Sequence, residues 1–198
     1  ERIADYIYYT SRKEATNAFN LYDASIGQGT NQFTPLQLAN YMATFANGGT
    51  RYKVHLVDKF LDPKGEVVEQ VKPEVIDKVE LKPQTVKTIK EGLAKVNLDE
   101  QGTASYVFKD FPIQTGGKTG SATYRVDQAD VGRTSYGLYL GFAPLDKPEI
   151  AVCVVIFDGG HGGYVAPTAR AIYESYFRET LKKDYPNFAP MYNYTLNP

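Results

Sequence analysis

Cysteine and tryptophan are scarce in this sequence of 198 residues, which has one cysteine and no tryptophan. A single cysteine excludes an internal disulfide bond. Cys153 lies in the apolar run IAVCVVIF, where we expect a buried side chain rather than a reactive thiol. Because hydrophobic residues make up 42% of the chain, ordinary apolar packing can supply the core of one domain.

The sequence also lacks an excess of charge and a long apolar run. Its 22 basic and 23 acidic residues give a net charge of −1, so we expect no nucleic-acid partner. No apolar run approaches the roughly 20 residues that span a bilayer, and the opening ERIADYIYYT is not a targeting signal. We interpret the chain as a piece of a longer protein.

Clear start and stop signals mark one helix, from Thr34 to Gly49. Thr34 suits the N-cap, Pro35 suits the first helical position, and Gly48 and Gly49 can end the helix. Its alanines and apolar face predict a central, well-buried helix.

Periodicity and turn residues predict the remaining elements. Before residue 110 we expect two strands around the turn 62–65, a helix and a short helical turn: 52–62, 66–72, Pro83–Asn97 and 101–108. After it we expect three strands and a closing helix: 113–124, 135–144, 148–158 and Ala166–Lys183. Short connections favour antiparallel neighbours. The predicted fold is therefore α+β, within the wider α/β class, with an antiparallel sheet flanked by helices.

The stretch TGGKTGSATY (115–124) combines three glycines with a lysine and several hydroxyls. Because glycine weakens a strand, its presence here predicts close approach of another chain, such as a peptide added at the sheet edge. Lys118 offers positive charge, Thr119 and Ser121 offer hydroxyls, and backbone N–H groups can face an oxyanion. Alone, K-T-G is weak evidence, since a surface lysine beside a bend is common.

Five blocks in order resemble the C-terminal half of a penicillin-binding protein transpeptidase domain. They are SIGQG, TPLQLANYMATFANGGT, GTASYVF, GGKTGSA and GLYLGFAP. The stretch NGGTRYKVHLVDKFLDPKGEVVEQ resembles class B members, in particular the branch associated with cell elongation. The resemblance implies the fold shared with serine β-lactamases. Residues 1–198 would be the C-terminal part of one transpeptidase domain.

Two motifs that this family carries beside K-T-G are missing. One is S-x-x-K, which holds the nucleophilic serine and its lysine base, and the other is S-x-N. The stretch TSRK (10–13) has threonine at the nucleophile position and lies on the wrong side of where S-x-N would stand. ERIADY resembles the segment that follows S-x-N, so both motifs are expected upstream. Ser121 stands where many relatives have threonine.

The resemblance implies a role for each residue of the motif strand. Lys118 and Ser121 are the catalytic candidates, because Lys118 would contact the S-x-N serine and the Ser121 N–H would face the oxyanion. Lys118, together with the hydroxyls of Thr119 and Ser121, would bind the substrate carboxylate, and Gly120 would leave room for the substrate backbone. No metal or organic cofactor is implied.

The function implied is peptidoglycan cross-linking by a D,D-transpeptidase that β-lactams acylate. Its substrate would be a D-alanyl-D-alanine stem peptide. The complete protein is expected at the extracytoplasmic face of the bacterial cytoplasmic membrane, with its anchor outside this chain. Without the N-terminal segment of the same protein, the chain is predicted to be inactive and not to fold stably.

Other functions stay open at this point. A non-catalytic β-lactam sensor or scaffold would keep the same strand, and a β-lactamase or carboxypeptidase is disfavoured by the class B blocks. His55 and His161 lack the spacing of metal ligands. DGGHGG (158–163) lacks the lysine of a phosphate-binding loop, so we interpret it as a loop at the mouth of the cleft.

Overall fold

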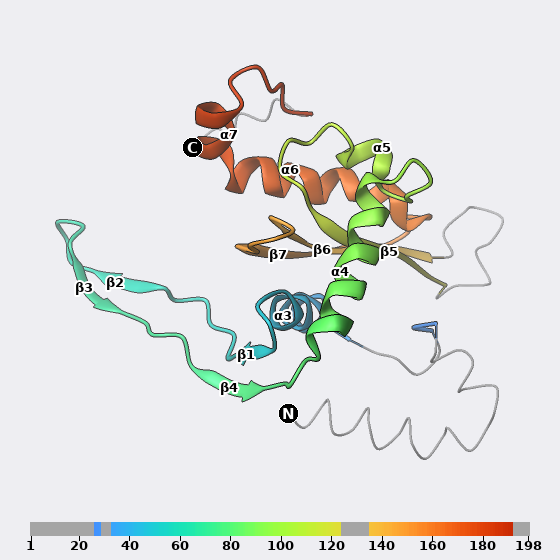
Figure 1. Cartoon of the computed structure of the whole chain (residues 1–198). Coiled ribbons are helices and arrows are strands. Elements are labelled where there is room, and N and C mark those ends of the chain that lie inside the picture. Colours follow the sequence, from blue (N-terminus) through green and yellow to red (C-terminus); the bar gives the residue numbers. More distant parts are fainter. Residues whose placement is uncertain (1–25, 29–32, 124–134, 192–198) are drawn as a thin grey trace, which may run out of the picture.

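A three-stranded antiparallel sheet, in the order β5-β6-β7, forms the centre of the protein (Figure 1). The structure is a computed structural model, and it describes residues 26–28, 33–123 and 135–191. The strands are β5 (Gly116–Thr123), β6 (Ser135–Ala143) and β7 (Ile150–Ile156). The helices are α3 (Pro35–Ala46), α4 (Pro83–Leu98), α5 (Ser105–Phe108), η2 (Gly162–Val165), α6 (Ala166–Tyr176) and α7 (Arg178–Asp184). Helices cover both faces, which confirms the predicted α+β arrangement.

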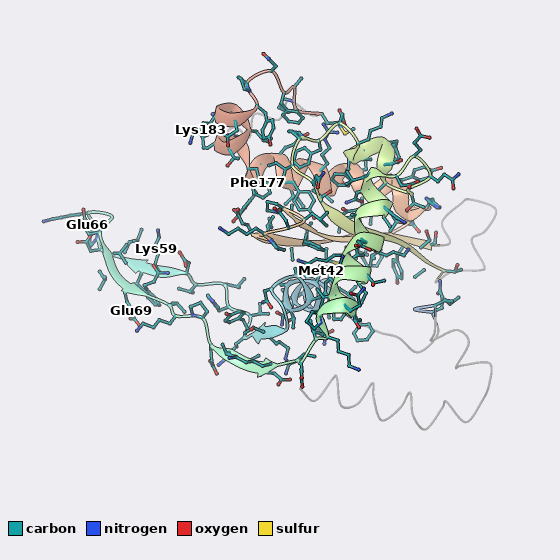
Figure 2. All side chains as sticks on the ribbon, viewed as in Figure 1. Met42, Lys59, Glu66, Glu69, Phe177 and Lys183 are labelled. Atoms are coloured by element: carbon teal, nitrogen blue, oxygen red, sulfur yellow. The ribbon has the colours of Figure 1, made fainter. Side chains whose placement is uncertain are left out.

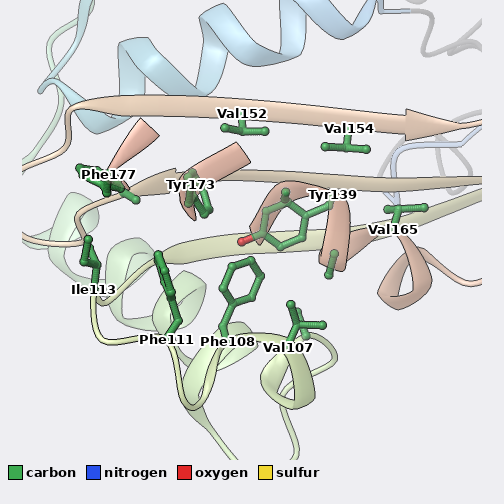
Figure 3. Close-up of a cluster of buried hydrophobic side chains, with 14 of the residues drawn as sticks. Val107, Phe108, Phe111, Ile113, Tyr139, Val152, Val154, Val165, Tyr173 and Phe177 are labelled. Carbon is green, nitrogen blue, oxygen red and sulfur yellow. The ribbon is translucent and has the colours of Figure 1, made fainter. Parts of the chain in front are cut away.

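The sheet separates two apolar cores, because successive side chains of a strand point to opposite faces. Tyr139 and Val154 face the larger core, which α5, α6 and α7 complete (Figure 3). Leu140 and Phe142 face the smaller core, which Met42 of α3 completes from the other side. The alternation in β6 therefore decides which helices cover which face of β5.

The ends of α3 lie where the sequence predicts them. The Thr34 hydroxyl accepts the N–H of Gln37 at 3.2 Å, and the Gln37 side chain accepts the N–H of Thr34 at 2.8 Å. This reciprocal pair satisfies two donors that the first turn leaves free. Met42 packs against the sheet, but Leu36 and Tyr41 are 58% and 65% exposed. The prediction of a well-buried helix is wrong here, because α3 packs through one side only.

Residues 50–78 form an arm that extends away from the sheet (Figures 1 and 2). Its strands are β1 (Thr50–Tyr52), β2 (Lys59–Leu61), β3 (Val67–Gln70) and β4 (Val75–Lys78). β1 pairs with β4 and β2 with β3, so the predicted pairing around the turn is confirmed. The single predicted strand 52–62 is wrong, because residues 53–58 interrupt it, and β4 was not predicted.

The turn at the tip of the arm follows its sequence. The Asp62 carboxylate accepts the N–H of Lys64 at 2.8 Å and that of Glu66 at 2.9 Å. Gly65 has a φ of 87°, which glycine adopts without strain. Aspartate and glycine therefore fix this turn locally, without help from the rest of the fold.

The predicted closing helix is two helices, α6 and α7, rather than one. The backbone leaves the helical region at Phe177, where φ is −89° and ψ is 16°. No glycine or proline marks this break in the sequence. The Phe177 side chain is buried in the larger core, and Leu181 of α7 is buried there as well. The bend thus keeps both side chains on the core after the direction of the chain changes.

One buried arginine ties α6 to α5 and to the segment that follows it. Arg170 is 1% exposed, and its Nε donates to Glu174 at 2.7 Å. Its Nη1 donates to the carbonyl of Val107 and to the carboxylate of Asp110, the latter at 2.6 Å. A buried guanidinium is tolerated because these acceptors replace the water that it loses.

Candidate functional site

Strand β5 carries the predicted site and lies at an edge of the sheet. Among the described residues it pairs with β6 alone, from Gly116 opposite Phe142 to Thr123 opposite Ser135. Its other edge therefore faces no strand within those residues. Such an edge can accept an extended peptide, as the sequence predicted. Tyr124, the last residue of the predicted strand, lies outside the described residues.

Lys118 leaves β5 on the opposite face from Thr119 and Ser121. Its register partner is Leu140 of the smaller core, whereas Thr119 lies opposite Tyr139 of the larger core. The three side chains thus share no face of the sheet. The edge of β5 is the one place that side chains from both faces can reach.

The Lys118 side chain is exposed, and its Nζ donates to the carbonyl of Thr119 at 2.7 Å. This contact brings the ammonium group back to the strand that carries it. It leaves further N–H bonds of the ammonium group for other acceptors, because a lysine has three. The predicted contact of Lys118 with a carboxylate stays a prediction.

Thr119 is buried, and its hydroxyl shares a hydrogen bond of 2.7 Å with the hydroxyl of Thr103. Thr103 precedes α5 and is itself exposed. A threonine hydroxyl has one proton and two lone pairs, so Thr119 can accept the proton of Thr103 and still donate its own to another group. Its predicted contact with a substrate carboxylate requires this arrangement, because an ionised carboxylate can only accept a hydrogen bond.

The hydroxyl of Ser121 contacts the loop that precedes α6. It accepts the N–H of Gly162 at 2.9 Å, which leaves its own proton for another partner. Gln28 approaches the same residue, donating from Nε2 to the Ser121 carbonyl at 3.0 Å. Segments that lie far apart in the sequence therefore meet at this residue.

Two of the three glycines of β5 do not have the role that the sequence predicted for them. A Cβ atom on Gly117 would lie 2.2 Å from the Tyr139 hydroxyl, and one on Gly116 would lie 2.9 Å from the Phe142 ring. Both glycines make room for side chains of β6, so their predicted role of admitting a ligand is wrong. A Cβ on Gly120 would meet Leu138 at 3.3 Å, a milder contact. The predicted role of Gly120 beside the substrate stays a prediction.

A buried polar cluster fixes the Tyr139 ring beneath β5. Asn97, at the end of α4, donates from Nδ2 to the hydroxyls of Tyr139 and Thr115, both at 2.8 Å. Burial raises the pKa of Tyr139 well above its ordinary value, so this hydroxyl stays protonated. The ring stacks on Phe108 with centroids 5.4 Å apart. The floor of the site is therefore rigidly packed.

Replacing Gly117 with alanine is expected to destabilise the fold by about 1–3 kcal/mol, because the Tyr139 ring cannot move aside without losing its partner Asn97. Gly92, inside α4, is the matched control, since its Cβ would meet nothing within 4 Å. Gly92→Ala should stabilise the protein by about 0.5–1 kcal/mol. Denaturant unfolding of the complete protein measures both. Equal effects of the two substitutions would contradict this account.

Sequence reasoning missed Thr103 and Gly162, which both contact the motif strand. Thr103 stands within the block GTASYVF, and Gly162 stands within DGGHGG. In the sequence, only their positions within these two stretches pointed to a role at the site. DGGHGG was predicted to lie at the cleft, and the structure places it against Ser121. His55 lies on the arm, away from β5, where its Nδ1 contacts the carbonyl of Val57.

Comparison with known proteins identifies relatives of this chain. A family model, the penicillin binding protein transpeptidase domain, matches residues 8–174. The chain is 37% identical to penicillin-binding protein 2A of Bacillus subtilis strain 168, over 69% of this chain and 20% of that protein. It is 32% identical to peptidoglycan D,D-transpeptidase MrdA of Acinetobacter baumannii, over 81% of this chain and 24% of that protein. The chain thus spans about a fifth to a quarter of these relatives.

Solved structures also resemble most of this chain. Penicillin-binding protein A from M. tuberculosis, as a ceftriaxone acyl-enzyme complex, superimposes with a TM-score of 0.67 at 27% identity. That match covers 80% of this chain and 36% of the other. A peptidoglycan synthase complex that coordinates polymerization and crosslinking also has a TM-score of 0.67, at 33% identity, covering 84% of this chain and 27% of the other.

Proposed function

This chain belongs to the penicillin-binding protein transpeptidase family, and we propose that it supplies the substrate-binding strand of a peptidoglycan D,D-transpeptidase. The class B, elongation-type resemblance and the fold predicted from the sequence are both confirmed by the relatives. The substrate proposed for the complete protein is a stem peptide that ends in D-alanyl-D-alanine. β-Lactams would acylate the same serine.

The observation that carries this proposal is the arrangement at the edge of β5. Lys118 leaves β5 on one face and Ser121 on the other, and both side chains are exposed. An acyl substrate added along the edge would place its terminal carboxylate between an ammonium group and a hydroxyl. Charge-assisted hydrogen bonds of this kind are stronger than bonds between neutral groups.

The proposed chemistry is acyl transfer through a serine ester. A serine oxygen bonds to the carbonyl carbon of the penultimate D-alanine, and the resulting oxyanion is stabilised by backbone N–H groups that include that of Ser121. The oxyanion collapses, the C–N bond to the terminal D-alanine breaks, and this D-alanine leaves with the proton that the serine hydroxyl gave up. The amine of a neighbouring strand then attacks the ester and releases the serine.

The nucleophile is proposed to come from an N-terminal segment of the same protein. No serine in these 198 residues is followed by lysine three positions later, as S-x-x-K requires. The exposed side of α3, with Leu36 and Tyr41, offers that segment an apolar surface. Its predicted association with this chain thus becomes part of the proposal.

We place the complete protein at the extracytoplasmic face of the bacterial cytoplasmic membrane, where its proposed substrate lies. Within residues 26–28, 33–123 and 135–191, no helix has the length and apolar character needed to cross a bilayer. We also propose that the membrane anchor lies outside this chain.

A fluorescent penicillin tests the proposal directly. The complete protein should become covalently labelled, and the isolated chain of 198 residues should not, because it has no S-x-x-K serine. Denaturing gel electrophoresis followed by fluorescence imaging detects the label. Labelling of the isolated chain would contradict the assignment of the nucleophile to another segment.

A β-lactam sensor on the same fold would also be labelled, so a second measurement separates the two functions. The transpeptidase should release D-alanine from a stem peptide when an acceptor amine is present. A sensor should form the penicillin adduct but release no D-alanine. Mass spectrometry of the cross-linked product measures this step.

A further inference from the structure

We propose that His161 is a positioning residue that orients the Ser121 hydroxyl toward the substrate carboxylate. It acts through the turn His161–Gly163, at the start of η2. This inference rests on the proposed function, because it concerns how the same strand binds its substrate.

The hydrogen bond from Gly162 determines what the Ser121 hydroxyl can do. The Gly162 N–H donates to Ser121 Oγ at 2.9 Å and so occupies one lone pair of that oxygen. The hydroxyl proton is not used in this contact. A fixed donor behind the oxygen therefore leaves the proton available at the exposed side of Ser121, where a carboxylate would accept it.

Three contacts fix the turn: one lies within it, one joins it to α5 and one places it beside β5. The His161 Nδ1 accepts the N–H of Gly163 at 3.1 Å, so the neutral ring carries its proton on Nε2. The Tyr106 hydroxyl donates to the carbonyl of Gly163 at 2.8 Å. Gly162 lies so close to β5 that a Cβ on it would come within 2.2 Å of the Gly120 carbonyl oxygen.

The turn around His161 is rich in glycine, so a side chain is needed to order it. Four of the five residues from 159 to 163 are glycines, and His161 is the exception. Glycines lose more conformational freedom on ordering than other residues, so such a segment needs a side-chain anchor. The imidazole provides one, because its Nδ1 accepts the Gly163 N–H. Without it the turn keeps only the bonds of Tyr106 to the Gly163 carbonyl and of Ser135 to the Gly160 carbonyl as side-chain anchors among the described residues, which loosens the bond from Gly162 to Ser121.

Two substitutions at His161 separate the acceptor from the ring. Alanine removes both, whereas asparagine keeps a side-chain oxygen that can accept an N–H two residues later. His55→Ala is the matched control, because His55 is the other histidine, is exposed, and also contacts a backbone group two residues away. The complete protein carries each substitution.

The measurement is the second-order rate of acylation by benzylpenicillin and by benzylpenicillin methyl ester. The ester lacks the carboxylate, so the ratio of the two rates reports the carboxylate contact and does not depend on the folded fraction. His161→Ala should lower this ratio about tenfold, as expected for losing a well-oriented hydrogen bond to a charged group. His161→Asn should keep most of the ratio, and His55→Ala should leave it unchanged.

A double-mutant cycle with Ser121→Ala completes the test, since His161→Ala should have no further effect on the ratio once the hydroxyl is gone. The inference is overturned if His161→Ala slows both compounds equally, if it changes neither, or if it lowers the ratio equally with and without Ser121. Absence of any acylation in the unsubstituted protein would instead overturn the proposed function, and this inference with it.

Discussion

Acylation of the complete protein by benzylpenicillin is expected to become about a hundredfold slower, or more, when Lys118 is replaced by alanine. The side chain is exposed at the edge of β5 and donates to the Thr119 carbonyl. In the proposed complex its ammonium group also attracts the substrate carboxylate and contacts the S-x-N serine. A preorganised charge of this kind stabilises the transition state.

Stability should change little in the same variant, because an exposed lysine contributes about 0.5 kcal/mol or less. The melting temperature is therefore measured beside the acylation rate. Lys87→Ala, at an exposed position of α4, is the control and should affect neither quantity. Lys118→Arg should restore only part of the rate, since a planar guanidinium differs in shape from an ammonium. An unchanged rate in Lys118→Ala would show that this lysine is only a solvated strand residue.

The largest loss of stability is expected from Arg170→Met, at about 3–5 kcal/mol. This substitution leaves Glu174, which is 8% exposed, without its cationic partner at 2.7 Å, although the Met191 N–H still donates to it. It also removes the donor to the Val107 carbonyl and to Asp110, so these links from α6 to α5 and to the segment after it are lost. Denaturant unfolding of the complete protein measures the change.

Two further variants distinguish a buried charge from a lost contact. Arg170→Met combined with Glu174→Leu should recover much of the stability, because it removes the unpaired carboxylate. Lys182→Met breaks the exposed pair of Lys182 with Glu179 and should cost about 1 kcal/mol or less. If Arg170→Met lowers the free energy of unfolding by less than Lys182→Met does, the role assigned to Arg170 is contradicted.

Acidification should weaken the same link gradually. The hydrogen bond from Arg170 holds the pKa of Asp110 below its ordinary value. Asp110 therefore stabilises the fold fully above the ordinary pKa of an aspartate, and this stabilisation is lost as pH falls through the lowered pKa. The Asp110 side chain is 66% exposed, so solvent screening keeps its contribution small.

Local signals in the sequence were enough to predict some elements. Thr34 and Pro35 define the start of α3 because the cap and the first turn depend on neighbouring residues only. The turn at Asp62 is predictable for the same reason. The strand β4 (Val75–Lys78) escaped prediction, because it is short and all four of its residues are exposed. Its partner β1 is fixed by pairing across the arm rather than by its own pattern.

The sequence predicted which residues of β5 form the candidate site, but not how their side chains are arranged. K-T-G placed Lys118, Thr119 and Ser121 on one strand, and the structure shows that they use opposite faces of it. The contacts of Thr103 with Thr119 and of Gly162 with Ser121 join residues 16 and 41 positions apart. No periodicity or spacing reports such contacts, because they depend on how α5 and η2 pack on the sheet.

The position of the penicillin adduct in the complete protein tests the central claim most directly. The protein is treated with benzylpenicillin, digested, and mapped by mass spectrometry. We predict one adduct, on a serine of an S-x-x-K motif outside these 198 residues, and its formation should slow about a hundredfold with Lys118→Ala. An adduct on any residue of this chain, or one that forms at the same rate without Lys118, would contradict the claim that β5 binds the substrate for a nucleophile supplied elsewhere.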